Sequence, residues 1–73
     1  MLETVAQKIK YLRLKAGLNR VQFTRHLGLK SRITSLHWES GRRHPNLAHC
    51  YKLINLARSV DLVWTLEDFM PKK

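Results

Sequence analysis

The sequence predicts a single all-α domain that spans residues 1–73 and forms a bundle of five helices. A chain of 73 residues is long enough for one hydrophobic core and one domain. Apolar side chains recur at intervals of three and four along most of the chain, which is the spacing of a helix, and no segment alternates with the period of a strand. Three glycines and two prolines separate these stretches and leave short connections between them.

The first two helices carry clear start and stop signals. The apolar positions expected in the first helix are Leu2, Val5, Ala6, Ile9, Leu12 and Ala16. Gly17 then supplies the left-handed residue that ends a helix. Asn19 is a good N-cap, and Gln22 three residues later completes a capping box. The second helix should therefore occupy residues 20–27.

A third helix should follow after a very short connection. Gly28 ends the second helix, and Ser31 caps a helix over residues 32–40 that stops at Gly41. A basic turn over residues 42–45 leads to the fourth helix. Its apolar residues form a broad stripe that we expect to be buried. They are Leu47, Cys50, Tyr51, Leu53, Ile54 and Ala57.

The C-terminal segment is expected to form the fifth helix, with Asp61 as its N-cap and Pro71 at its end. Its apolar residues are Leu62, Val63, Trp64, Leu66, Phe69 and Met70. They are too many for one short helix to bury against a small core, so some should form a surface patch.

The charge distribution indicates a polyanionic partner. Residues 1–46 contain ten Lys and Arg and two acids, a net charge of +8 out of a total of +9. No acid stands between Glu3 and Glu39. A basic surface of this kind favours nucleic acid, although it also serves as a generic solubilising surface.

Other classes of function find little support. His44, His49 and Cys50 do not have the spacing of a zinc site, and no catalytic constellation or phosphate-binding glycine loop is present. We therefore expect no enzymatic activity, metal, cofactor or small-molecule ligand. The single Cys50 favours a reducing compartment, and neither a leader peptide nor a long apolar run is recognisable. A cytoplasmic protein without a membrane partner is expected.

Two short helices joined by a tight turn, within the basic part of a small helical domain, have the geometry that fits a DNA groove. Residues 17–28 (GLNRVQFTRHLG), 38–45 (WESGRRHP) and 60–64 (VDLVW) resemble segments of the Cro/CI-type (XRE) helix-turn-helix repressors of phages and bacteria. The resemblance covers nearly the whole chain. It implies a five-helix, lambda-repressor-like DNA-binding domain whose second and third helices form the helix-turn-helix.

The chain departs from that family at two places. Arg20 stands where the family has glutamine, and it can still hold a phosphate. One extra residue lies between Gly28 and Trp38, which we place at residues 29–30 so that Ser31 remains the N-cap. Ser35 then occupies a position where a buried aliphatic residue is expected.

In this register the resemblance implies which side chains of the third helix face base edges, namely Arg32, Ile33, Thr34 and His37. Arg32 is the strongest candidate, because a guanidinium pairs bidentately with guanine. Ile33 and Thr34 are suited to a thymine methyl group. The alternative is that Ile33 and Leu36 are core residues and that Thr34 is only solvated.

The expected phosphate contacts are Lys10, Arg20, Lys30, Ser31, Arg42 and Arg43. Such contacts supply affinity rather than sequence information. Lys8, Lys15 and Arg25 serve equally well as plain surface charges. The expected core residues are Ile9, Leu12, Phe23, Leu27, Trp38, Leu53 and Ile54.

The resemblance also implies a structural ion pair between Arg13 and Glu39, which ties the first helix to the end of the third. A homodimer is expected because one recognition helix reads only a few base pairs. Trp64, Leu66 and Phe69 are the candidates for its interface, and the alternative for Trp64 is a place in the core of one protomer.

The sequence thus predicts a sequence-specific repressor that binds an inverted-repeat operator on double-stranded DNA and regulates its own gene. The resemblance implies a bacterial or phage-encoded, nucleoid-associated protein. An antitoxin-type interaction module is one alternative, because fold does not fix function. RNA binding is another, although the chain lacks the exposed aromatic pairs that stack unpaired bases.

Overall fold

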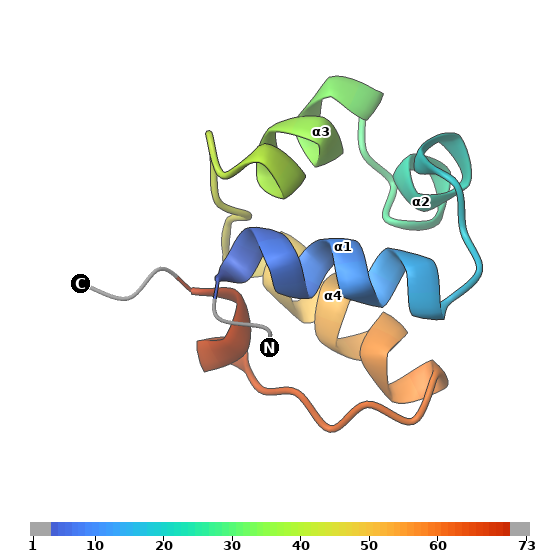
Figure 1. The fold of residues 1–73 in the computed structure, drawn as a ribbon, viewed down its shortest axis with the longest axis vertical. Helices are drawn as coiled ribbons and strands as arrows, with labels where there is room; N and C mark the ends of the chain where they lie inside the picture. The colour runs from blue at the N-terminus through green and yellow to red at the C-terminus, as the bar shows by residue number, and fades with distance from the viewer. Residues whose placement is uncertain (1–3, 71–73) are drawn as a thin grey trace.

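The computed structural model describes residues 4–70 and contains four α-helices and one short 3₁₀ helix (Figure 1). They are α1 (Val5–Lys15), α2 (Arg20–His26), α3 (Arg32–Ser40), α4 (Leu47–Ser59) and η1 (Leu66–Phe69). No strand occurs in residues 4–70, so the prediction of an all-α chain is confirmed for them. Leu2 and Pro71, expected at the start of the first helix and the end of the last, lie outside the described residues.

Side-chain caps fix where the helices begin. Asn19 accepts a hydrogen bond of 2.8 Å from the backbone N–H of Gln22, whose side chain accepts one of 3.0 Å from the Asn19 N–H. The Ser31 hydroxyl accepts from the N–H of Ile33 at 3.1 Å and caps α3. Both predicted caps are confirmed. Asn46 caps α4 in the same way.

The four α-helices all end in a left-handed residue that allows two reversed backbone hydrogen bonds. Gly17, Gly28 and Gly41 fill this position after the first three helices, as predicted. Asp61 fills it after α4, with a φ of 62°. Its N–H donates to the Arg58 carbonyl at 3.2 Å, and the N–H of residue 62 donates to the carbonyl of residue 57 at 2.8 Å.

This use of Asp61 corrects the prediction of a fifth helix capped by that residue. An N-cap needs an extended backbone, whereas Asp61 is left-handed and its N–H is bonded to α4. The chain therefore leaves α4 without helical structure over residues 62–65. Thr65 then precedes the single 3₁₀ turn of η1, and its N–H donates to Asp68 at 2.8 Å.

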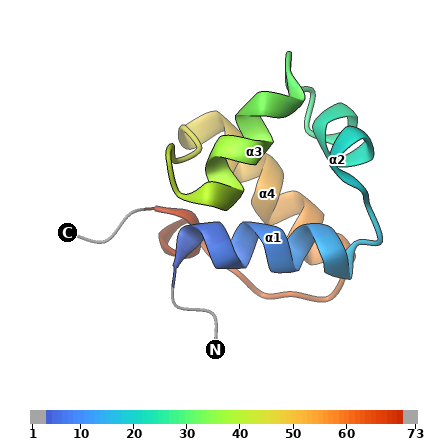
Figure 2. The same cartoon turned by 45° about the horizontal axis from the view of Figure 1, so that its top comes forward.

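The helices enclose one core. α1 packs against α3, α4 and η1, and α2 packs against α3 (Figures 1 and 2). All seven residues predicted to form the core are buried. The predicted stripe on α4 is only partly correct, because Leu47 and Tyr51 are each 54% exposed. The buried face of α4 is centred near Leu53 and Ala57, and Leu47 and Tyr51 lie to one side of it, while Leu56 is buried instead.

The C-terminal segment packs onto the bundle through Phe69. Phe69 is completely buried, so its expected role in a dimer interface is corrected: the η1 turn points the ring into the core of its own protomer. The Trp64 ring is half-buried between Tyr11, at a ring-centroid distance of 6.0 Å, and Phe69, at 5.5 Å. Val63, by contrast, is 93% exposed.

An ion pair joins η1 to α1. Lys8 Nζ lies 3.1 Å from Asp68 Oδ1. The pKa of Asp68 is lowered, chiefly by the hydrogen bond from the Thr65 N–H and further by Lys8, against the opposing effect of burial. Because folding lowers this pKa, ionised Asp68 stabilises the fold fully at pH values above the usual pKa of about 3.8. This stabilisation is lost as the pH falls through the lower pKa of the folded state.

Among residues 4–70, no helix has the length and apolar character needed to cross a membrane.

Candidate nucleic-acid interface

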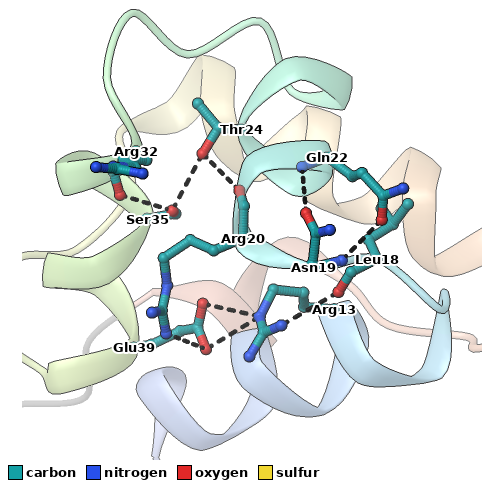
Figure 3. Close-up of polar contacts among 9 residues, drawn as sticks. All are labelled: Arg13, Leu18, Asn19, Arg20, Gln22, Thr24, Arg32, Ser35 and Glu39. Carbon is teal, nitrogen blue, oxygen red and sulfur yellow. Dashed lines mark hydrogen bonds and ion pairs between the residues drawn. The ribbon is translucent and has the colours of Figure 1, made fainter.

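The carboxylate of Glu39, near the end of α3, forms ion pairs with two arginines of other helices. Its side chain is only 4% exposed. Arg13 Nε of α1 donates to both carboxylate oxygens, at 3.3 and 3.2 Å. Arg13 Nη1 also donates to the carbonyl of Leu18 at 3.1 Å, in the turn before α2 (Figure 3). The ion pair expected between Arg13 and Glu39 is therefore present, and it also holds the start of α2.

Arg20 is a second partner of this carboxylate, which the sequence analysis did not predict. Its Nη2 lies 3.5 Å from Glu39 Oε1, while the side chain remains 39% exposed (Figure 3). Arg20 Nε is buried and has no hydrogen-bond partner among residues 4–70. The sequence feature that could have indicated this contact is that Glu39 is the only acid in residues 4–60, so any ion pair there must involve it. With two guanidinium groups on one carboxylate, the site keeps a net positive charge at the first residue of α2.

Two hydroxyl groups lie between α2 and α3. Ser35 is fully buried and Thr24 is 8% exposed, and their oxygens are 3.4 Å apart. Thr24 Oγ1 donates to the Arg20 carbonyl at 2.8 Å, and Ser35 Oγ donates to the Arg32 carbonyl at 3.0 Å (Figure 3). Because both hydroxyls are satisfied within their own helices, they can be buried here without a large penalty. The position where an aliphatic residue was expected is buried, but a serine fills it.

The inward face of α3 determines which residues point outward. Ser35 and Trp38 are buried, and the Trp38 ring contacts His49 of α4 at a centroid distance of 5.2 Å. Ile33 and Leu36 are 54% and 43% exposed, so the alternative that they form the core of α3 is wrong. The pKa of His49 is lowered by burial, and further by the positive charge of Lys52.

The outward face of α3 brings most of the predicted site residues together. Ser31, Ile33, Thr34, His37 and Arg43 line a hollow of about 350 Å³. This set contains three of the four predicted base contacts and two of the predicted phosphate contacts.

A second hollow lies beside the first, between the start of α2 and α3. Its volume is about 240 Å³, and its lining residues are Arg20, Val21, Arg32, Ile33 and Leu36. Ile33 borders both hollows and Arg32 lines only the second. Val21 and Leu36 were not among the predicted site residues, although their helical spacing from buried Phe23 and Trp38 indicates that they face outward.

Exposed cations lie just before and just after α3, and residues 4–60 contain no exposed acid. Lys30, just before α3, and Arg42, just after it, are exposed, although they line neither hollow. Lys10 is exposed on α1 and also lines neither. The one acid in residues 4–60 is the buried Glu39, and the other acids of the described segment lie in residues 61–68.

No protein family, curated protein or solved structure matches this chain. Within residues 4–70, no group of three or more His, Cys, Asp or Glu side chains is placed to hold a metal ion.

We expect Glu39→Ala to lower the free energy of unfolding by about 3 kcal/mol, because it leaves Arg13 and Arg20 without a counter-charge in a largely buried site. Chemical denaturation measures this loss. Glu67→Ala is the matched control, since Glu67 is an exposed acid on η1 and its removal should cost less than about 0.5 kcal/mol.

A double-mutant cycle tests the coupling directly. Adding Arg13→Ala to Glu39→Ala should cost less than the sum of the two single losses, because one of the two orphaned guanidinium groups is gone. Simple additivity of the two losses would count against the pair.

Proposed function

We propose that this chain is a helix-turn-helix protein that binds double-stranded DNA in a sequence-specific manner and represses transcription, with α3 in the major groove. The observation that carries the proposal is the outward face of α3. Side chains suited to base edges and to phosphates meet there around one hollow, while the only acid of residues 4–60 is buried on the opposite side of the helix.

The arrangement of α2 and α3 supports this proposal. An α-helix fits the width of the major groove, and in helix-turn-helix proteins the preceding helix crosses the DNA backbone. α3 is reached from α2 through residues 27–31, and Ser31 at its start is exposed, so the positive end of the helix dipole is accessible to a phosphate there. Arg20 at the start of α2 and Arg43 after α3 lie on either side of the predicted base contacts.

The proposed mode of action is autorepression by a homodimer. Each copy supplies one α3, and the 29 Å extent of the described structure is less than the spacing of about 34 Å between successive half-sites on one face of DNA. Two copies are therefore needed to read an inverted repeat. The role in repression rests on the resemblance of residues 17–28 and 38–45 to Cro/CI-type repressors.

The surface that best fits a dimer contact is the loop between α4 and η1. A hollow of about 380 Å³ there is lined by Arg58, Asp61, Leu62, Val63, Trp64 and Thr65. Trp64 is shared between this hollow and the protomer core, and Leu66 packs partly against the core. Val63 is almost fully exposed and has no such role within the protomer. We therefore place Val63 beside Trp64 in the proposed interface.

Arg32→Ala should weaken binding to the preferred DNA sequence by about 1–3 kcal/mol and weaken binding to random DNA much less, because a base contact distinguishes sequences. Arg43→Ala should weaken both by a similar factor and reduce the salt dependence by about one ion. The preferred sequence is obtained by selection from random duplexes, and affinities are measured by fluorescence anisotropy over a range of salt concentrations.

Lys15→Ala is the matched control, since it removes an exposed lysine from the last turn of α1 that lines none of these hollows, and it should leave DNA affinity nearly unchanged. Equal losses on selected and random DNA for Arg32→Ala would assign Arg32 to the phosphate contacts. Tighter binding to single-stranded RNA than to any duplex would contradict the proposed function.

Val63→Asp should convert the dimer into a folded monomer, because it places a charge on an apolar contact while removing nothing from the protomer core. Sedimentation velocity measures the change, and circular dichroism verifies the fold. Tyr51→Asp, at an exposed position on α4, is the control and should remain dimeric. A wild-type protein that is monomeric at all concentrations, both alone and on its DNA, would overturn the dimer.

A further inference from the structure

Three exposed aliphatic side chains meet in the hollow between α2 and α3. Val21, Ile33 and Leu36 are 42%, 54% and 43% exposed, and all three line the hollow of about 240 Å³. Single exposed apolar residues are ordinary, whereas a cluster formed by two helices within a charged surface is a candidate binding site.

Two arginines form the rest of the lining. Arg20 is held in place, because one of its guanidinium nitrogens is 3.5 Å from Glu39. Arg32 is exposed, and its side chain makes no hydrogen bond or ion pair within residues 4–70. The occupant that fits this hollow therefore combines a small apolar group with hydrogen-bond acceptors or negative charge close by.

The major groove of DNA presents that combination. Its one apolar group is the 5-methyl group of thymine, and the O6 and N7 acceptors of guanine are the preferred partners of arginine. 5-Methylcytosine carries the same methyl group at the same ring position. The phosphates of either strand supply the negative charge that complements Arg20.

We propose, on the basis of the proposed DNA binding, that this hollow receives the 5-methyl group of a pyrimidine that lies directly next to a guanine bound by Arg32. Val21 and Leu36 are then specificity-determining residues that contact the methyl group together with Ile33. The site thereby distinguishes thymine from uracil and 5-methylcytosine from cytosine.

The test compares duplexes that differ by one methyl group. A preferred duplex is first selected from random DNA. Each thymine next to a guanine is then replaced by deoxyuridine, one at a time, and in a second series the same position carries cytosine or 5-methylcytosine paired with guanine. Removing the methyl group that enters the hollow should weaken binding about fourfold, the factor that corresponds to burial of one such group, roughly 0.8 kcal/mol.

Substitutions in the hollow test whether its lining residues cause the preference for the methyl group. Leu36→Ala should reduce the ratio of affinities between methylated and unmethylated duplexes toward one. Leu14→Ala is the matched control, because Leu14 is 59% exposed on α1 and outside the hollow, so the variant should retain the full ratio.

The outcomes separate the inference from the proposed function. A methyl effect in the thymine series assigns thymine, and one in the cytosine series assigns 5-methylcytosine. If the protein binds duplexes but no methyl group changes its affinity, the inference is overturned while DNA binding stands. If Leu36→Ala retains the full ratio of affinities between methylated and unmethylated duplexes, the hollow does not bind the methyl group and the inference is overturned. An apolar protein partner would then be the remaining occupant of the hollow. Failure to bind any duplex, even at low salt, would instead overturn the proposed function.

Discussion

One buried carboxylate holds together the part of the molecule that carries the candidate site. Glu39 of α3 bonds Arg13 of α1, which also bonds the turn before α2, and it pairs with Arg20 at the start of α2. A buried ion pair adds little net stability, because desolvation offsets attraction, but loss of one member leaves an uncompensated charge. All other charged side chains in residues 4–60 are positive, so the orientation of α1, α2 and α3 depends on this acid.

The polar and apolar residues of α3 are distributed in an unusual way between its buried and its exposed face. The polar residue Ser35 faces Thr24 in the interior, whereas the aliphatic residues Ile33 and Leu36 are exposed. Ordinary burial of apolar surface favours the reverse, since complete burial of an isoleucine or leucine side chain stabilises a fold by roughly 1.5–3 kcal/mol. An arrangement that sacrifices stability at the surface is typical of a binding site, and it accounts for the two adjacent hollows on this face.

Much of this fold could be predicted because its signals are local. Asn19, Ser31 and three glycines fix the end of α1 and both ends of α2 and α3. Each signal lies within a few residues of the helix end that it fixes, so it can be read from the sequence. The C-terminal segment could not be predicted in this way, because Asp61 supports either a cap or a left-handed turn, and hydrogen bonds to α4 determine the result. The pairing of Arg20 with Glu39 and the burial of Phe69 depend on contacts between distant parts of the chain.

We propose that the outward face of α3, held by Glu39, is the surface that meets DNA. Backbone amide NMR of the labelled protein during titration with a selected DNA duplex tests it most directly, because every residue reports separately. We expect the largest shifts at residues 31–37 and 42–43 and little change over residues 66–69. Shifts confined to residues 58–65, with α3 unchanged, would contradict the account.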